Sequence, residues 1–200
     1  MDGFRAAGGA PEQVDLVVFS HVRGDHIQGF RKPDGAAVFV DAAVMVPDAA
    51  RALWMDDARM SAAPEATQGA FRGVRRVVGP IRDEVERFAG EREPVPGLTA
   101  LPAPGHTSGH GVSLVTSGEG RHPVRSDPTD EREPFVRHPT RRVRFAMNGE
   151  VATATRPRLL ALAAAERMTV RGYHFPFPAV GHIARDRAAC DHVPTFWRAA

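Results

Sequence analysis

Short apolar runs separated by turn residues predict β-strands along this chain. The first run, residues 14–19, is continuous and rich in β-branched residues, as in a buried strand. A second run at 36–40 follows a Pro-Asp-Gly turn, and two more, at 98–101 and 112–115, lie on either side of a loop that contains two histidines. We expect the first two strands to pack into one sheet.

Helical patterns alternate with the strand-like runs, which favours a mixed α/β fold. A short helix is expected over 47–54, and a longer helical stretch over 61–88 is interrupted by a Gly-Pro pair. This region resembles an insertion that covers a site. Residues 150–167 predict another helix, followed by a strand at 169–173 and by a weak last strand at 194–197.

Composition agrees with one soluble domain. The chain has 200 residues, of which 42% are hydrophobic, and a chain of this length buries roughly 70% of its unfolded surface. The apolar runs are too short for a membrane span and the first residues do not resemble a signal peptide, so we expect a cytoplasmic protein without a membrane partner. The formal net charge is only +2, which does not favour nucleic acid as a partner.

The single cysteine, Cys190, cannot form an internal disulfide.

Potential metal ligands follow the first predicted strand. His21, Asp25 and His26 lie within a stretch of six residues that begins directly after the apolar run. A strand that ends by delivering imidazoles and a carboxylate into a tight turn clusters ligands for a borderline cation such as zinc. The stretch therefore indicates one half of a metal site.

Several motifs together resemble the metallo-β-lactamase fold hydrolases, closest to the branch with methyl parathion hydrolase and lactonase-like enzymes. The family pattern is H-x-H-x-D-H after a strand, then a Gly-His-Thr-x-Gly-His loop, a Gly-Asp pair after a later strand, and a final histidine. The corresponding positions here are residues 21–26, residues 105–110, Ser126-Asp127 and His174. The resemblance covers nearly the whole chain.

The resemblance implies the αββα sandwich of that family, here as a single partial domain over residues 1–200. Family members have several strands before the first histidine motif, whereas this chain reaches His21 almost at once. The N-terminal strands therefore appear to be missing, and an unpaired strand edge is expected. A second copy of the chain could cover that edge as a homodimer.

The resemblance also implies two neighbouring metal sites that share Asp127. The first site would contain His21 and His106, and the second would contain Asp25, His26 and His174. In such proteins water bound between the ions attacks the scissile bond of a small-molecule substrate, and Asp25 could orient that water. Zinc is the expected metal, with manganese or cobalt as alternatives.

Arg23 departs from the family pattern, because it stands where a further ligand histidine of the first site is expected. A guanidinium stays protonated and offers only donors, so it cannot bind a cation. At ~4 Å from a divalent ion and an effective dielectric of ~20, its repulsion would be roughly 8 kcal/mol. We therefore expect one ion rather than two. Residues 120–126, which precede Asp127, also contain a proline and charges that suit a buried strand poorly.

Two functions of different classes are compatible with these residues. One is a metal-dependent hydrolase of an ester, lactone, β-lactam or phosphotriester bond. The other is a catalytically inactive remnant, or a ligand-binding or assembly module, that retains the fold. Trp54 and Phe71 match aromatic positions that line the substrate pocket of the resembling branch, and ordinary core packing explains them equally well.

Overall fold

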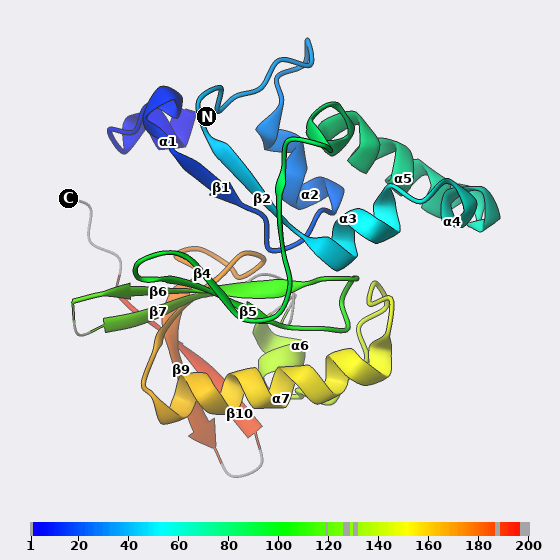
Figure 1. The fold of residues 1–200 in the computed structure, drawn as a ribbon. Helices are drawn as coiled ribbons and strands as arrows, with labels where there is room; N and C mark the ends of the chain where they lie inside the picture. Colours follow the sequence, from blue (N-terminus) through cyan, green and yellow to red (C-terminus); the bar gives the residue numbers. More distant parts are fainter. Residues whose placement is uncertain (1, 119, 126–128, 130–131, 187–188, 197–200) are drawn as a thin grey trace. The chain divides into compact units, whose positions relative to one another are not determined.

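The chain divides into two compact units in the computed structural model, residues 1–89 and residues 90–200. The structure describes residues 2–118, 120–125, 129, 132–186 and 189–196 (Figure 1). Among these residues, no helix has the length and apolar character needed to cross a membrane. Each unit has its own sheet and its own apolar core, so we describe them one at a time.

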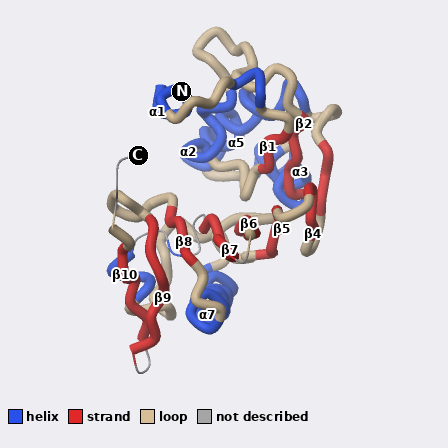
Figure 2. The backbone as a smooth tube through the Cα atoms, turned by 90° about the vertical axis from the view of Figure 1, so that its left-hand side faces the viewer, coloured by secondary structure: helices blue, strands red, loops and turns tan. Residues whose placement is uncertain are grey.

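The first unit contains a parallel three-stranded sheet in the order β1-β2-β3, of which Figure 2 labels the neighbouring strands β1 and β2. Its strands are β1 (Leu16–Val18), β2 (Ala43–Pro47) and β3 (Glu86–Phe88), and Val17 pairs with Val44. The strand predicted at 14–19 is confirmed in its central part.

The strand predicted at 36–40 is wrong, because that segment folds back on residues 30–31. Ala37 makes an isolated bridge with Arg31, and the Val38 backbone N–H donates to the Phe30 carbonyl at 2.9 Å. The strand begins later, at Ala43. Both runs are apolar, and the pairing with β1 selects the second one, whose Met45 and Val46 are buried.

Helices supply most of the apolar core of the first unit. Phe71, Val74 and Val78 form an inward stripe on the longest of them and pack with Leu53 and Trp54. Residues 47–88 are therefore an integral part of this core. The helices are α1 (Asp2–Ala6), η1 (Pro11–Gln13), α2 (Gly24–Ile27), η2 (Gln28–Phe30), α3 (Asp48–Trp54), α4 (Asp57–Ala62), α5 (Glu65–Val78) and η3 (Gly79–Ile81).

The helical continuation predicted over 81–88 is wrong. Pro80 occurs just after α5, where proline cannot continue the hydrogen-bond pattern, and the chain makes one further turn before it becomes extended. Residues 86–88 then pair with β2, where Met45 is the partner of Glu86. Sheet pairing thus overrides the helical pattern of this segment.

The second unit is built on a seven-stranded sheet in the order β10-β9-β8-β7-β6-β5-β4. All neighbours are antiparallel except β7 and β8, which are parallel. The strands predicted at 98–101, 112–115 and 169–173 are confirmed as β5, β6 and β8. The strands are β4 (Arg92–Val95), β5 (Leu98–Pro102), β6 (Gly111–Ser117), β7 (Gly120–Arg125), β8 (Thr169–Gly172), β9 (Val180–Asp186) and β10 (Ala189–Pro194).

Two expectations for the strands of this sheet need correction. The last strand, β10, ends at Pro194, where the sequence pattern predicted one to begin, because its residues pair with β9 from Ala189 onward. Strand β7 forms inside the sheet although its sequence suits a buried strand poorly. It pairs with β6 over five residues but with β8 only at Val124 and Arg125, so Pro123 lies outside the β7–β8 ladder.

The helix predicted over 150–167 is confirmed as α7 (Gly149–Ala165), which follows the short helix α6 (Arg132–Val136). Helix α7 runs along one face of the large sheet (Figure 1). Its Leu160 and Ala163 are buried in one cluster with Val170 of β8 and Ile183 of β9. This packing fixes the N-terminal end of α7, which borders the loop that carries His106.

Candidate metal centre

The turn after β1 places one carboxylate and two imidazoles close together in the first unit. Asp25 and His26 lie on α2, and His21 lies in the extended segment before it. The His21 and His26 ring centroids are 4.2 Å apart. His26 Nε2 is 3.3 Å from Asp25 Oδ2, and the Asp25 side chain is 53% exposed. These three predicted ligands are therefore brought together within one unit.

The separation of the Asp25 and His26 atoms fits a shared cation. Two ligands of one tetrahedral zinc, each at about 2.0–2.1 Å from the ion, lie about 3.3–3.4 Å from each other. The observed 3.3 Å between Nε2 and Oδ2 is in this range. This pair of donor atoms therefore fits zinc.

His21 is fully buried and oriented by its neighbour. Its Nδ1 lies 3.2 Å from Ser20 Oγ. If Nδ1 carries the proton and donates to the hydroxyl, Nε2 is the nitrogen with the lone pair that a metal needs. This tautomer makes His21 suitable as a ligand, and Ser20 is a positioning residue that the sequence analysis missed.

Arg23 has a clear backbone role at the start of α2. It is the N-cap residue, with φ −83° and ψ 157°, and its carbonyl oxygen accepts from the His26 and Ile27 N–H groups at 3.0 and 3.2 Å. No side-chain cap is made. Since any residue adopts these angles, histidine could replace arginine here without disturbing the turn.

The loop between β5 and β6 carries His106 in the second unit. His106 is buried, and its ring centroid is 5.2 Å from that of His110. His110 Nδ1 lies 2.8 Å from the Ala103 carbonyl oxygen, and because a carbonyl can only accept, Nδ1–H donates. His110 therefore closes the base of the loop.

A second segment holds the His106 loop from outside. The Met147 N–H donates to the His106 carbonyl and the Asn148 N–H to the Gly105 carbonyl, both at 2.9 Å. Gly105 has φ +122°, and a Cβ atom there would lie 2.2 Å from the Ala152 backbone nitrogen. Asn148 is a further residue of this site that is absent from the sequence-based candidates, although an Asn just before a helical pattern is a typical N-cap signal.

His174 lies in the turn after β8, also in the second unit. Phe175 is buried against Gly172, and the Phe175 N–H donates to the Gly172 carbonyl at 3.2 Å. This anchor leaves the neighbouring His174 exposed, with the Tyr173 ring edge-on at 4.8 Å. The turn therefore presents an imidazole at the end of β8, as the sequence pattern predicts.

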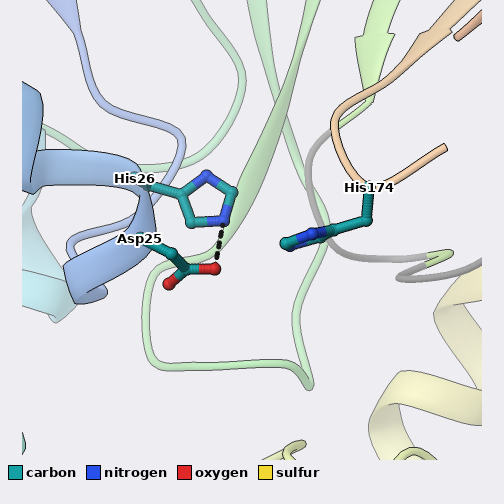
Figure 3. A group of neighbouring side chains, drawn as sticks. All are labelled: Asp25, His26 and His174. Atoms are coloured by element: carbon teal, nitrogen blue, oxygen red, sulfur yellow. Dashed lines mark ion pairs between the residues drawn. The ribbon is translucent and has the colours of Figure 1, made fainter. Parts of the chain in front are cut away.

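Figure 3 shows Asp25 and His26 of the first unit, with their ion pair as a dashed line, and His174 of the second unit. The three side chains are of types that could hold a metal ion. Asp127, the predicted bridging ligand, lies outside the described residues.

Trp54 and Phe71 belong to the core of the first unit. Their ring centroids are 4.7 Å apart at an interplanar angle of 60°, and both side chains are buried. The Trp54 carbonyl oxygen also accepts from Arg75 Nε at 2.9 Å. Within this unit, packing accounts for both aromatic residues.

Comparison with solved structures gives close matches of fold. The hydrolase AbOPH of the beta lactamase superfamily has a TM-score of 0.90 at 22% identity, covering 99% of this chain and 70% of that one. AidC, a dizinc quorum-quenching lactonase, has a TM-score of 0.89 at 19% identity, covering 99% and 70%. A probable metal-dependent hydrolase from Staphylococcus aureus has a TM-score of 0.73 at 17% identity, covering 86% and 58%. No family model and no curated protein matches the chain.

Proposed function

Because the chain has the metallo-β-lactamase fold, we propose that it is a metal-dependent hydrolase of small-molecule ester, lactone, β-lactam or phosphotriester bonds. The observation that carries the proposal is the 3.3 Å contact between His26 Nε2 and Asp25 Oδ2, which has the spacing of two ligands on one zinc ion. The structures of similar fold support the proposal, since two of them are described as a dizinc lactonase and a probable metal-dependent hydrolase.

We assign one ion to the ligand set that the family resemblance implies. Asp25 and His26 of the first unit and His174 of the second would hold it, with Asp127 as a further ligand. His21 and His106 would belong to the first site of the sequence analysis, which the positive charge of Arg23 would weaken. Zinc is the proposed metal because imidazole and carboxylate ligands suit it.

When bound, such an ion would polarise the carbonyl or phosphoryl oxygen of the substrate and lower the pKa of water. The Asp25 side chain is 53% exposed, so its carboxylate could meet a water molecule and orient it. The Ser20 hydroxyl fixes the ring of His21, and the Asn148 N–H fixes the loop that carries His106. These residues position ligands and would not touch the substrate.

Metal analysis together with a hydrolysis screen tests the proposal. The purified chain should retain about one zinc per chain and should hydrolyse some chromogenic esters, lactones or phosphotriesters. The double substitution Asp25→Asn and His26→Ala should remove both properties, whereas Asp34→Asn, on an exposed turn, should change neither. A folded protein that binds no zinc, manganese or cobalt would end the proposal.

Arg23→His tests the assignment of the weakened position. It should raise the zinc content from about one to about two ions per chain, because it restores a ligand without changing the backbone of the N-cap. Arg23→Met removes the charge but adds no ligand, so its zinc content should stay near one. An unchanged content in Arg23→His would contradict the role given to Arg23.

Arg23 also motivates the second candidate, a module that keeps the fold without catalysis. A guanidinium in place of a ligand is the change expected where selection for metal binding has been lost. Stable folding with no bound metal and no hydrolysis by either the wild type or Arg23→His would favour this alternative.

A further inference from the structure

A cavity of about 290 Å³, open to solvent on one side and lined mainly by apolar side chains, lies in the first unit, where the loop before β2 meets the turn before β3. Phe30, Phe39, Val44 and Val85 contribute to its wall, and Glu84 is the one charged residue in its lining. An engineered cavity of about 150 Å³ holds one benzene molecule. The space therefore suits a ligand with one aromatic ring and a short chain.

The chain geometry directs Glu84 towards this cavity. The Glu84 and Val85 N–H groups both donate to the Ile81 carbonyl, at 2.9 and 3.0 Å. In such a helical turn, positions i, i+3 and i+4 share one side. Ile81, Glu84 and Val85 all line the cavity, so a carboxylate belongs to an otherwise apolar face.

The charge of Glu84 is not neutralised within the described part of the chain, where no ion pair to its carboxylate occurs. The adjacent Asp83 differs, because its carboxylate pairs with Arg51 at 3.2 Å and with Arg82 at 3.3 Å. A carboxylate at the rim of an apolar cavity favours a ligand that combines an apolar body with a positive charge.

The aromatic rings indicate where each part of such a ligand would lie. Phe39 is held between Phe30, at 6.3 Å between centroids, and Phe4, at 6.4 Å. Arg31 already places its guanidinium 5.8 Å from the centre of the Phe30 ring. A second cation is disfavoured there, so the positive group would pair with Glu84 at the rim and the ring would enter the apolar interior.

We propose that this cavity binds a small arylalkyl amine, with its ammonium group on Glu84 and its ring against Phe39 and Val44. The site lies wholly in the first unit, and none of its residues is among the proposed metal ligands. Its occupant would be distinct from the substrate of the hydrolase.

Binding of 2-phenylethylamine, followed by NMR chemical shifts of the zinc-loaded full chain at low salt, tests the proposal, with 2-phenylethanol as the neutral comparison. The amine should bind about threefold more tightly, as for one exposed charge pair. Glu84→Gln should abolish this preference and leave the alcohol unaffected. Asp83→Asn, which alters a neighbouring carboxylate outside the cavity lining, should preserve it.

Filling the cavity provides an independent check. Ala42→Phe should weaken the binding of both compounds at least tenfold. If this variant does not fold, Ala37→Leu replaces it: this is a smaller change in the same lining, and it should weaken the binding of both compounds to a lesser extent. Equal binding of amine and alcohol to the wild type, or no binding of either, would overturn the proposal. Zinc content, measured in the same samples, should not change in any variant.

Discussion

The Asn148 backbone N–H donates to the Gly105 carbonyl oxygen at 2.9 Å, which joins the cap of α7 to the loop that carries His106. Asn148 also uses its side chain, whose Oδ1 accepts from the Val151 N–H at 3.1 Å. One residue therefore both starts the helix and fixes the loop. The position of His106 depends on this junction, because the Met147 N–H donates to the His106 carbonyl from the same segment.

Gly105→Ala should destabilise the second unit by about 3 kcal/mol. Gly105 has φ +122°, which strains any L-residue, and the added Cβ would lie 2.2 Å from the Ala152 backbone nitrogen. Urea unfolding measures the loss. Gly73→Ala is the control, because Gly73 lies inside helix α5 with open space around it, and there alanine should gain about 0.5–1 kcal/mol. Equal effects at the two positions would contradict the account of the junction.

Asn148→Ala should cost about 1 kcal/mol, the usual effect of losing an N-cap side chain. Asn148→Asp should retain nearly all of the stability, since its carboxylate can accept the same bond from Val151. Thermal unfolding of the two variants gives the comparison. If alanine and aspartate proved equally destabilising, the cap would not account for the role of this residue.

The fold could be predicted because its signals are local and clustered in motifs. The matches at residues 21–26, 105–110 and 174 lie at strand-to-turn junctions, as expected, and the fold inferred from them is confirmed by the solved structures. Pairing between distant segments was harder to foresee. Residues 36–40 and β2 are both apolar, and only contact with β1 selects the second run. Strands β9 and β10 alternate apolar and polar residues weakly, so the pattern missed β9 and placed the last strand too late, at 194–197.

The site shows the same division between local and long-range information. Asp25 and His26 belong to one short motif, so their placement in the same turn could be expected. The bond between Asn148 and Gly105 could not, because it joins segments that meet only after α7 packs on the sheet. The role of Arg156 is likewise long-range information, since only the tertiary structure shows which groups accept hydrogen bonds from its buried guanidinium.

Arg156→Met should destabilise the second unit by about 3 kcal/mol. The side chain of Arg156 is 1% exposed and donates to the Pro139 and Arg141 carbonyls at 2.6 and 2.8 Å, with its guanidinium 4.8 Å from the Phe135 ring centre. Methionine fills the space but leaves both carbonyl groups without this donor.

Arg158→Met provides the matched control for Arg156. It changes the same residue type in the same helix, but Arg158 is solvent-accessible, and among the described residues its side chain donates only to the Pro102 carbonyl, at 3.0 Å. Its loss should cost about 0.5–1 kcal/mol. The loss in free energy of unfolding, measured with urea, should therefore be severalfold larger for Arg156→Met than for Arg158→Met. Similar losses in the two variants would show that burial does not determine how much Arg156 contributes to stability.

Zinc should stabilise the folded chain if Asp25, His26 and His174 bind one ion. At a free concentration a hundred times the Kd, binding contributes about 2.7 kcal/mol, provided that the unfolded chain does not bind. For a chain of this length that corresponds to a rise in Tm of about 5–10 °C, which a chelator should reverse. His174→Ala should remove most of the rise. His182→Ala should keep it, because His182 is an exposed residue of β9 outside the proposed ligand set. Loss of the rise in both variants, or in neither, would contradict the assignment of His174 as a ligand.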